Sequence, residues 1–448
     1  MRYVRGSMKT GTGYEGMERI IAHADCNCYY ASVEMLRNPR LRDVPMAVCG
    51  RTEERHGIVL TANYPAKRRG VKTGMANWQA RKACPGIYTV PPRYDDYIQF
   101  SGFVRDLYYR YTDRIEPFGL DEAWIDLTGC ASSFSQGEKA VQEIRERVKR
   151  ELGLTVSIGL ADNKVFAKLG SDMKKPDACT AIPADRFRDI VWPLPVGELL
   201  YVGRSTEAQL RARYINTIGD LARTDPANLK RWFGKVGLVL YAFANGEDRS
   251  LVAPAGFEPP IKSIGNSQTC PRDLETDTDV KIMIYALSES VGARLMELGL
   301  YASTVEFWFL DNELKNHGTR QCKISAPTNL SGEIADTAFR LFRKSYGHWP
   351  KPLRKVGVRG CDLVSTEIPR QLTVFEDGSR TAAREELERV VNGLRKRYGN
   401  KVIQRALMYT DQEISGVDAK RDHTIHPVGV FNGGMSVSWG GYTTTIMR

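Results

Sequence analysis

The chain has 448 residues, too many for one compact core, so we expect two to four domains. With 42% hydrophobic and 26% charged residues it resembles ordinary globular proteins, which excludes a disordered or fibrous chain. The net charge of +11 favours a polyanionic partner, with a solubilising surface as the alternative. The basic residues cluster at Lys67, Arg68, Arg69 and Lys72, and at Lys164, Lys168, Lys174 and Lys175.

Cysteine usage and hydropathy indicate the compartment. Of nine cysteines only Cys26 and Cys28 lie close together, and no paired CxxC elements predict a zinc site, so we expect reduced thiols in a cytosol. No apolar stretch is long enough to span a bilayer, and no signal peptide precedes the first predicted strand. Residues 1–16 predict a flexible leader or an expression remnant.

The N-terminal part of the chain predicts alternating strands and helices. The predicted strands are 18–25, 45–50, 57–62 and 154–161, and the predicted short helices are 30–36, 66–69, 78–83 and 163–173. Two longer helices are amphipathic, because apolar residues recur at helical spacing from Tyr97 to Tyr111 and from Val141 to Leu152. Residues 115–129 predict a hairpin between them. This order favours a mixed α/β core with helices on one side of a sheet.

Short helices are expected from about residue 185 to 248. Within them, 201–210 and 233–246 each place a glycine just ahead of a helix start. Free amides at a helix N-terminus bind phosphate without reading a base, so this segment is a candidate DNA-backbone module. Two ordinary helix–turn–helix joints are the alternative.

The stretch 251–260 is punctuated by proline and glycine and predicts a linker. The segments that follow predict strand, helix, strand, strand, helix and strand at 261–269, 280–298, 303–311, 319–327, 334–346 and 353–363. This β-α-β-β-α-β order indicates a compact sheet with two helices on one face. Beyond 368 we expect a tail with one charged helix at 381–397 and a glycine-rich end.

Three acidic residues are candidates for metal chemistry. Asp25 closes the first predicted strand, while Asp121 and Glu122 lie at the bend of the hairpin. If the two strands are neighbours, the three carboxylates meet at one end of the sheet. Phosphoryl transfer needs such converging carboxylates, because divalent metals align the attacking hydroxyl and neutralise the triphosphate. A solvated acidic turn is the alternative.

Four motifs in fixed order surround these carboxylates: HADCNCYYASVE at 23–34, TANYPAKRRGVKTGM at 61–75, IEPFGLDEAWIDLTG at 115–129 and GLADNKVFAKLGSDMKKP at 159–176. Together they resemble the Y-family DNA polymerases, nearest the bacterial polymerase IV branch, over about residues 18–365. The resemblance implies translesion DNA synthesis of low fidelity, without proofreading. It also implies an α/β (α+β) right-hand fold of palm, fingers and thumb plus a β-α-β-β-α-β little finger.

The resemblance divides the chain into domains. They are a leader at 1–17, a palm at 18–28 and 93–183, fingers at 29–92, a helical thumb at 184–250, a linker at 251–260, a little finger at 261–367 and a tail at 368–448.

Carried over residue by residue, Asp25, Asp121 and Glu122 match the metal-binding carboxylates, and Cys26 matches the position whose backbone carbonyl completes a metal's shell. The implied cofactor is two Mg²⁺ ions, with Mn²⁺ also admitted by oxygen ligands. Tyr30 matches the steric gate, a ring that leaves no room for a ribonucleotide's 2′-hydroxyl. An ordinary aromatic core contact is the alternative for Tyr30.

The triphosphate-binding positions of the family fall on Thr61, Tyr64, Lys67 and Lys175. Solvated surface lysines are the alternative for the last two. Position 67 is usually arginine, and lysine lacks the two-pronged guanidinium, so we expect Arg68 to share the task.

Two further departures from the family pattern stand out. Asn27 stands where polymerase IV usually has aspartate, and in this respect the chain resembles UmuC-like members. Tyr201 replaces the first glycine of the thumb's backbone-binding hairpin. The thumb contact with DNA is therefore expected to be weaker or rearranged.

The segment from Gln371 to Phe375 resembles the pentapeptide by which bacterial polymerases dock on the sliding clamp. Leu372 and Phe375 would fill an apolar groove while Gln371 hydrogen-bonds at its rim. An edge strand is the alternative.

The resemblance implies three partners, namely primer-template DNA, dNTP and a sliding clamp, and no association with a membrane. It also implies a monomer that acts in the cytoplasm at the nucleoid. Two other functions are open: a catalytically idle homologue acting as a DNA-bound scaffold, and another palm-fold enzyme such as a nucleotide cyclase. Retained carboxylates and Tyr30 argue against the scaffold, and the steric gate and the extra DNA-binding modules argue against the cyclase.

Overall fold

A computed structural model describes residues 18–50, 57–257, 260–346, 351–368, 378–416, 435–439 and 442–446. The predicted leader at 1–17 lies outside these residues. The chain forms two compact units, a first built mainly from Val59–Pro259 with the preceding Met1–Cys49, and a second built mainly from Pro260–Ile425. Within the described ranges, none of the helices has the length and apolar character that a bilayer span requires.

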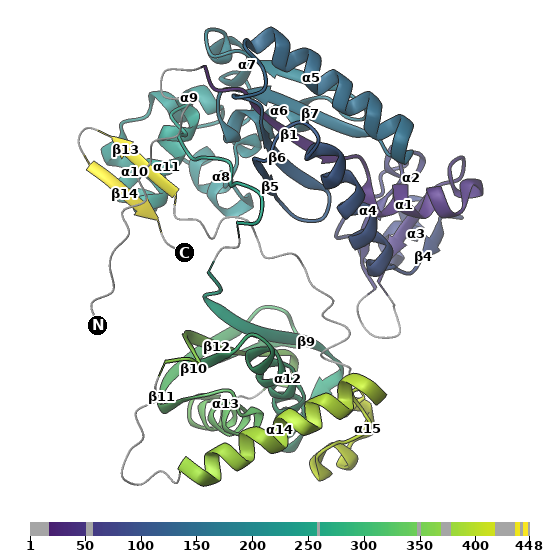
Figure 1. Ribbon diagram of the computed structural model, residues 1–448, viewed down its shortest axis with the longest axis vertical. Helices are drawn as coiled ribbons and strands as arrows, with labels where there is room; N and C mark the ends of the chain where they lie inside the picture. Colours follow the sequence, from purple (N-terminus) through teal and green to yellow (C-terminus); the bar gives the residue numbers. More distant parts are fainter. Residues whose placement is uncertain are drawn as a thin grey trace. The chain divides into compact units, whose positions relative to one another are not determined.

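A five-stranded sheet forms the centre of the first unit, in the order β5-β6-β1-β7-β8 (Figure 1). Its strands are β1 (Ile21–Cys26), β5 (Ile115–Pro117), β6 (Glu122–Asp126), β7 (Val156–Ala161) and β8 (Cys179–Ile182). β1 is central and fully buried, pairing antiparallel with β6 and with β7. The predicted hairpin at 115–129 is therefore confirmed as β5 and β6, whereas β8 was not predicted.

Helices cover both faces of this sheet, so the expectation of helices on one side is wrong. On one face α6 (Lys164–Met173) packs Phe166 and Leu169 into a core with Ile21 of β1. On the other face the core includes Val104 of α4 (Tyr94–Tyr108) and Ile144 of α5 (Phe134–Arg147), which continues as a π-helical turn η2 (Val148–Leu152). Successive β1 residues point to opposite faces, and since every one is buried, both faces need cover.

A smaller three-stranded sheet, β3-β2-β4, follows β1 in the chain. Its elements are α1 (Tyr29–Arg37), η1 (Pro39–Leu41), β2 (Met46–Cys49), β3 (Val59–Ala62), α2 (Tyr64–Arg68), α3 (Asn77–Ala83) and β4 (Tyr88–Val90). All but η1 and β4 were predicted. Asn63 fixes this segment, because its buried side chain caps α2 through the amide of Ala66 and also bonds the backbone of Leu41, Val44 and Met46.

The predicted helical segment is confirmed. It consists of α7 (Phe187–Val191), η3 (Val196–Glu198), α8 (Arg204–Arg211), α9 (Ile218–Arg223), α10 (Pro226–Phe233) and α11 (Lys235–Ala244). Gly203 and Gly234 are the N-cap residues of α8 and α11, as the sequence predicts. Tyr201, at the position of the family glycine, has a φ of 71°, so the backbone keeps a left-handed conformation that glycine would adopt without strain.

The second unit has the predicted β-α-β-β-α-β order. Its elements are β9 (Ser263–Leu274), α12 (Asp277–Glu297), β10 (Leu300–Asp311), β11 (His317–Thr328), α13 (Ser331–Tyr346) and β12 (Leu353–Ser365). The antiparallel sheet runs β11-β10-β12-β9, and Phe307 and Phe309 of β10 share a core with Ile284 of α12 and Phe342 of α13.

The chain beyond this sheet folds back onto the second unit. α14 (Gly378–Tyr398) contains the predicted charged helix, and it is followed by η4 (Ala406–Thr410) and α15 (Gln412–Ser415). Met408 and Ile414 are buried in the second unit's core. We call residues 378–416 the strap. A further pair of strands, β13 (Met435–Trp439) and β14 (Tyr442–Ile446), was not predicted.

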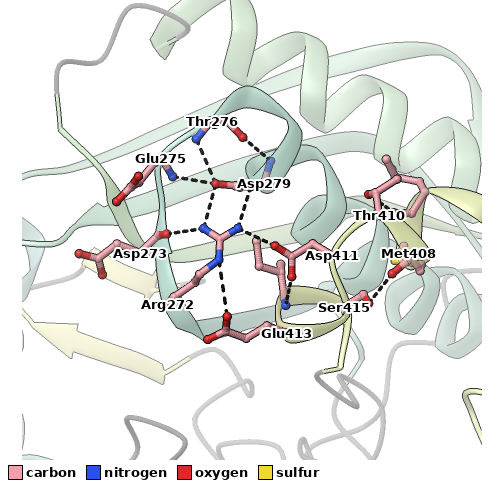
Figure 2. Close-up of polar contacts among 12 residues, drawn as sticks. Arg272, Asp273, Glu275, Thr276, Asp279, Met408, Thr410, Asp411, Glu413 and Ser415 are labelled. Carbon is pink, nitrogen blue, oxygen red and sulfur yellow. Dashed lines mark hydrogen bonds and ion pairs between the residues drawn. The ribbon is translucent and has the colours of Figure 1, made fainter.

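Arg272 fastens the strap (Figure 2). Its guanidinium donates to both carboxylate oxygens of Asp279 at 3.0 and 3.1 Å and to Asp411 of the strap at 2.6 Å. Asp279 in turn caps α12 together with Thr276, and Asp411 caps α15 through the amide of Ile414. One cation therefore joins two helix caps that are distant in sequence.

The predicted clamp-binding segment, Gln371 to Phe375, lies outside the described residues. Its flanks are described, however: β12 ends at Ser365 and α14 begins at Gly378. In sequence, the segment therefore lies between two described elements of the second unit.

Arg272→Ala is expected to loosen the strap, because it leaves the nearly buried Asp279 and the cap residue Asp411 without their shared cation. We expect the unfolding free energy to fall by about 2 kcal/mol. Hydrogen–deuterium exchange of residues 405–416 should rise. The matched control is Arg389→Ala, whose pairing with Glu386 is exposed on α14 and should change stability by roughly 0.5 kcal/mol or less. Equal protection of residues 405–416 in both variants would contradict this role.

Candidate active site

The strand register brings three carboxylates to one end of the central sheet. Asp25 of β1 lies directly opposite Glu122 of β6. Asp121 immediately precedes β6, and its carbonyl accepts a hydrogen bond of 2.9 Å from the amide of Cys26. This backbone bond continues the β1–β6 pairing past the strand ends, so it fixes Asp121 beside the other two acids.

Two lysines from α6 and the loop after it neutralise part of this charge. Lys175 Nζ lies 2.5 Å from Asp25 Oδ2 and 2.9 Å from an oxygen of Asp172. Lys168 Nζ lies 2.9 Å from Glu122, 3.1 Å from Asp172 and 3.5 Å from Asp25. The cluster thus holds four carboxylates and two ammonium groups.

Burial and mutual repulsion raise the pKa values of two of the acids. Burial, together with the charges of Glu122 and Asp25, raises the pKa of Asp121 to about 7. Burial and Glu122 also raise the pKa of Asp25, although both lysines oppose the shift. Burial lowers the pKa of Lys168, but the surrounding carboxylates outweigh it and the net shift is upward. The two lysines therefore stay charged and still leave the acids crowded.

The donor set fits a hard divalent cation. Asp25, Asp121, Glu122 and the carbonyl of Cys26 supply only oxygen atoms, which Mg²⁺ and Mn²⁺ prefer. Among the described residues no three acidic, histidine or cysteine side chains converge closely enough to share one ion as they stand, because lysine ammonium groups lie between the carboxylates. The unneutralised charge on Asp121 is what a bound cation would relieve.

His23 was not predicted and lies directly beneath Glu122. It is fully buried, with Nδ1 2.9 Å from the hydroxyl of Ser171 and Nε2 3.3 Å from Glu122 Oε2. Burial, followed by the charge of Lys168, lowers the pKa of His23. The alternation of β1 could have signalled it, because His23 and Asp25 are two residues apart and share a face.

Lys168 and Asp172 were also missed as site residues, although Lys168 was noted within a basic cluster. They are four residues apart on α6, a spacing that places them on one helix face. What the sequence does not show is that this face lies over the end of β1.

The aromatic residues after β1 separate into a buried ring and a half-buried ring. Tyr29 is 2% exposed, and its hydroxyl donates to the carbonyl of Tyr97 at 2.5 Å. Tyr30 stacks on the Tyr97 ring at a centroid distance of 4.3 Å and meets Tyr94 edge-on. Burial, then the charge of Asp121, raises the pKa of Tyr30 to about 12. Tyr30 is thus the ring that remains accessible near the carboxylates.

The predicted triphosphate residues come from three elements. Thr61 is on β3, Tyr64 begins α2, and Lys67 lies one turn later with its ammonium 5.2 Å from the centre of the Tyr64 ring. Burial and Cys28 raise the pKa of Tyr64, and Asp25 contributes to the shift. Lys175 already contacts Asp25. Arg68 and Tyr64 both line a cavity beside α2.

Asn27 has a structural role that explains why an amide suits this position. It is buried, donates to Ser157 at 2.9 Å and accepts from the amide of Asp177 at 2.8 Å. An aspartate here would add a further negative charge two residues from Asp25, in a site whose acids are already incompletely neutralised.

Family models match three parts of the chain. The model of the impB/mucB/samB family matches residues 24–172, and the model of that family's C-terminal domain matches residues 261–374. A model described as the DNA polymerase-iota thumb domain matches residues 198–248.

Curated relatives and a solved structure agree with these matches. The chain is 47% identical to a DNA polymerase IV of Acetivibrio thermocellus over 401 residues, 90% of this chain and 100% of that protein. It is 38% identical to DNA polymerase IV 1 of Bacillus subtilis over 400 residues, 89% of this chain and 95% of the relative. The fold resembles a Y-family DNA polymerase chimera with a TM-score of 0.68 and 24% identity, covering 77% of this chain and 99% of the chimera.

The crowding at Asp121 predicts a pH-dependent stability in the absence of metal. Because the folded chain raises the pKa of Asp121 to about 7, ionising this acid costs folding free energy. The cost is absent near pH 4 and complete above the raised pKa. With a chelator present, Asp121→Asn should therefore melt at a higher temperature than the parent at about pH 8 and at the same temperature at about pH 4.

Saturating Mg²⁺ at the higher pH is the control for this comparison. It should stabilise the parent more than the variant, because only the parent keeps the full ligand set. A melting-temperature difference that is the same at both pH values would show that the crowding is not electrostatic.

Proposed function

This chain belongs to the Y-family DNA polymerases, the impB/mucB/samB family, and from that premise we propose how its side chains perform the reaction. It is a DNA-directed DNA polymerase of the translesion type, a metal-dependent nucleotidyltransferase that adds dNTPs to a primer on a template. The observation that carries the assignment of the site is the convergence of Asp25, Asp121 and Glu122 in a largely buried place, where burial and the neighbouring acids raise the pKa of Asp121 to about 7.

We propose that these three carboxylates and the carbonyl of Cys26 hold two Mg²⁺ ions, with Mn²⁺ as a substitute. When bound, the metals align the primer hydroxyl and neutralise charge on the triphosphate. The carboxylates fix where this happens, because Asp25 and Glu122 are held opposite each other by the β1–β6 register.

The ammonium groups of Lys175 and Lys168 contact the same carboxylates that are proposed to hold the metals. Each is paired with Asp25 and Asp172, so each can shift from the carboxylates towards an incoming polyanion without leaving a buried cation unpaired. Lys175 is the phosphate-binding lysine of this proposal, together with Thr61, Tyr64 and Lys67. Lys67 supplies a single ammonium charge where the family usually has an arginine guanidinium. The cation–π contact with the Tyr64 ring positions this ammonium group.

Tyr30 is proposed as the steric gate. Its ring is held by stacking on Tyr97, which is itself anchored through a hydroxyl bond to Glu34. A ring braced in this way resists displacement by an extra hydroxyl on the sugar.

Primer-template DNA is expected to be held through its phosphates by the N-termini of α8 and α11 and by the second unit's sheet. A sliding clamp is the proposed further partner, bound through Gln371, Leu372 and Phe375. We also propose a monomer acting in the cytoplasm at the nucleoid.

Glu122→Ala should abolish primer extension, with a loss of at least about a hundredfold in rate, while DNA binding stays within about twofold, because this carboxylate holds metal rather than duplex. The matched control is Asp126→Asn, at the other end of the same strand, where the carboxylate caps the amide of Thr128. Primer extension and fluorescence anisotropy measure the two effects. Parent-like extension by Glu122→Ala would refute the metal assignment.

Tyr30→Ala should relax sugar selection without destroying catalysis, since it opens the space that a 2′-hydroxyl needs. The ratio of kcat/KM for dNTP over the matching rNTP is expected to fall about a hundredfold, an effect on the order of 3 kcal/mol. Tyr29→Phe is the control, because Tyr29 is buried and only its hydroxyl can be removed without opening the core. A ratio that stays at the parent value in Tyr30→Ala would place the gate elsewhere.

Replacing Leu372 and Phe375 together by alanine should remove stimulation by a loaded clamp and leave distributive synthesis as it is. Substitution is preferable to deletion because it keeps the number of residues between β12 and the strap unchanged. The control is Thr373→Ala, whose side chain has no assigned contact with the clamp. Stimulation of the double variant equal to that of the parent would remove the clamp from the proposal.

A further inference from the structure

A cavity of about 840 Å³ opens between α1, the loop from Arg42 to Pro45, α2 and the turn before β7, all within the first unit. The three carboxylates do not line it, and neither does Tyr30. It is therefore separate from the place proposed for the incoming nucleotide's sugar and for the metals.

The cavity wall is strongly basic. Among the described residues, four basic side chains line it, with Asp43 as the one acidic residue: Arg42, Arg68, Arg69 and Lys149. Lys149 is paired with Asp177 at 2.8 Å, and Arg69 donates to the sulfur of Cys84 at 3.8 Å. Within the described part of the chain, Arg42 and Arg68 form no ion pair. Guanidinium groups without carboxylate partners, gathered round one hollow, favour an anion with several negative charges.

The inner end of the cavity touches the loop that follows Asp25. Ser32 and Thr155 both line it, and both bond the backbone of Asn27: the Ser32 hydroxyl donates to the Asn27 carbonyl at 2.7 Å, and the Asn27 amide donates to the Thr155 carbonyl at 2.8 Å. Tyr64, a proposed triphosphate residue, lines the cavity as well. The basic hollow thus adjoins the triphosphate positions across Tyr64 and the β1–α1 loop.

We propose that this cavity receives inorganic pyrophosphate as it leaves the active site. The inference rests on the proposed function, because nucleotidyl transfer releases pyrophosphate from the end of the triphosphate that Tyr64 and Lys67 contact. The arginines attract the released anion away from the carboxylates. Because Arg42, Arg68 and Arg69 are exposed, solvent screens their charge, so the product is held weakly enough to depart.

The test compares pyrophosphate with dNTP as competing ligands of the same enzyme. The ratio of the Ki for pyrophosphate to the KM for dNTP, in primer extension, is expected to rise about tenfold in Arg42→Ala. Asp43→Asn, which removes the one acidic side chain that the described residues place in the wall, should lower the ratio about threefold. Arg40→Ala is the matched control, since this exposed arginine lies two residues from Arg42 and outside the cavity wall.

Equilibrium dialysis of radiolabelled pyrophosphate against the full-length protein without DNA separates the two proposals. Pyrophosphate binding that weakens in Arg42→Ala and tightens in Asp43→Asn supports the cavity proposal, whether or not the parent extends primers. Failure of the parent to extend primers would contradict the proposed function and leave the cavity result standing. Pyrophosphate binding and inhibition that are the same in Arg42→Ala, Asp43→Asn and Arg40→Ala would overturn the cavity proposal.

Discussion

The crowding of Asp25, Asp121 and Glu122 at the end of β1 is the constraint on which the rest of the first unit depends. Three acids in a largely buried site repel one another, and among the described residues Lys168 and Lys175 offset them. Folding tolerates this because the β1–β6 register and the Cys26–Asp121 backbone bond hold the acids by main-chain contacts. The unfavourable energy left in the site comes from burial and charge repulsion, and a divalent cation is the species that we propose relieves it.

Much of this site could be predicted from the sequence, because its signals are local. Asp25 ends an apolar run, and the acidic pair lies in a hairpin bend flanked by apolar strands. Lys168 could not be placed, because its contacts depend on how α6 lies over the sheet, whereas His23 was missed although it shares a face of β1 with Asp25. The same limit explains the error about helices on one side: a strand such as β1, buried along its whole length, does not reveal which helices cover each face.

The second unit shows the same division between local and distant information. Its β-α-β-β-α-β order could be predicted from periodicity, whereas the strap could not. Arg272 and Asp411 are 139 residues apart, and nothing in either neighbourhood specifies the other. Two short strands were also missed, β4 of three residues and β8 of four. Because the strap belongs to the second unit, the clamp-like segment lies in sequence between β12 and α14.

The most direct test of the account is to count the metal ions at the carboxylates. Electron paramagnetic resonance can titrate Mn²⁺ into the parent bound to a template, a primer lacking its 3′-hydroxyl and the complementary dNTP. The account predicts two bound ions in the parent and fewer in Asp121→Asn, because that variant loses one of the crowded acids. Two ions bound with unchanged affinity in Asp121→Asn would contradict it.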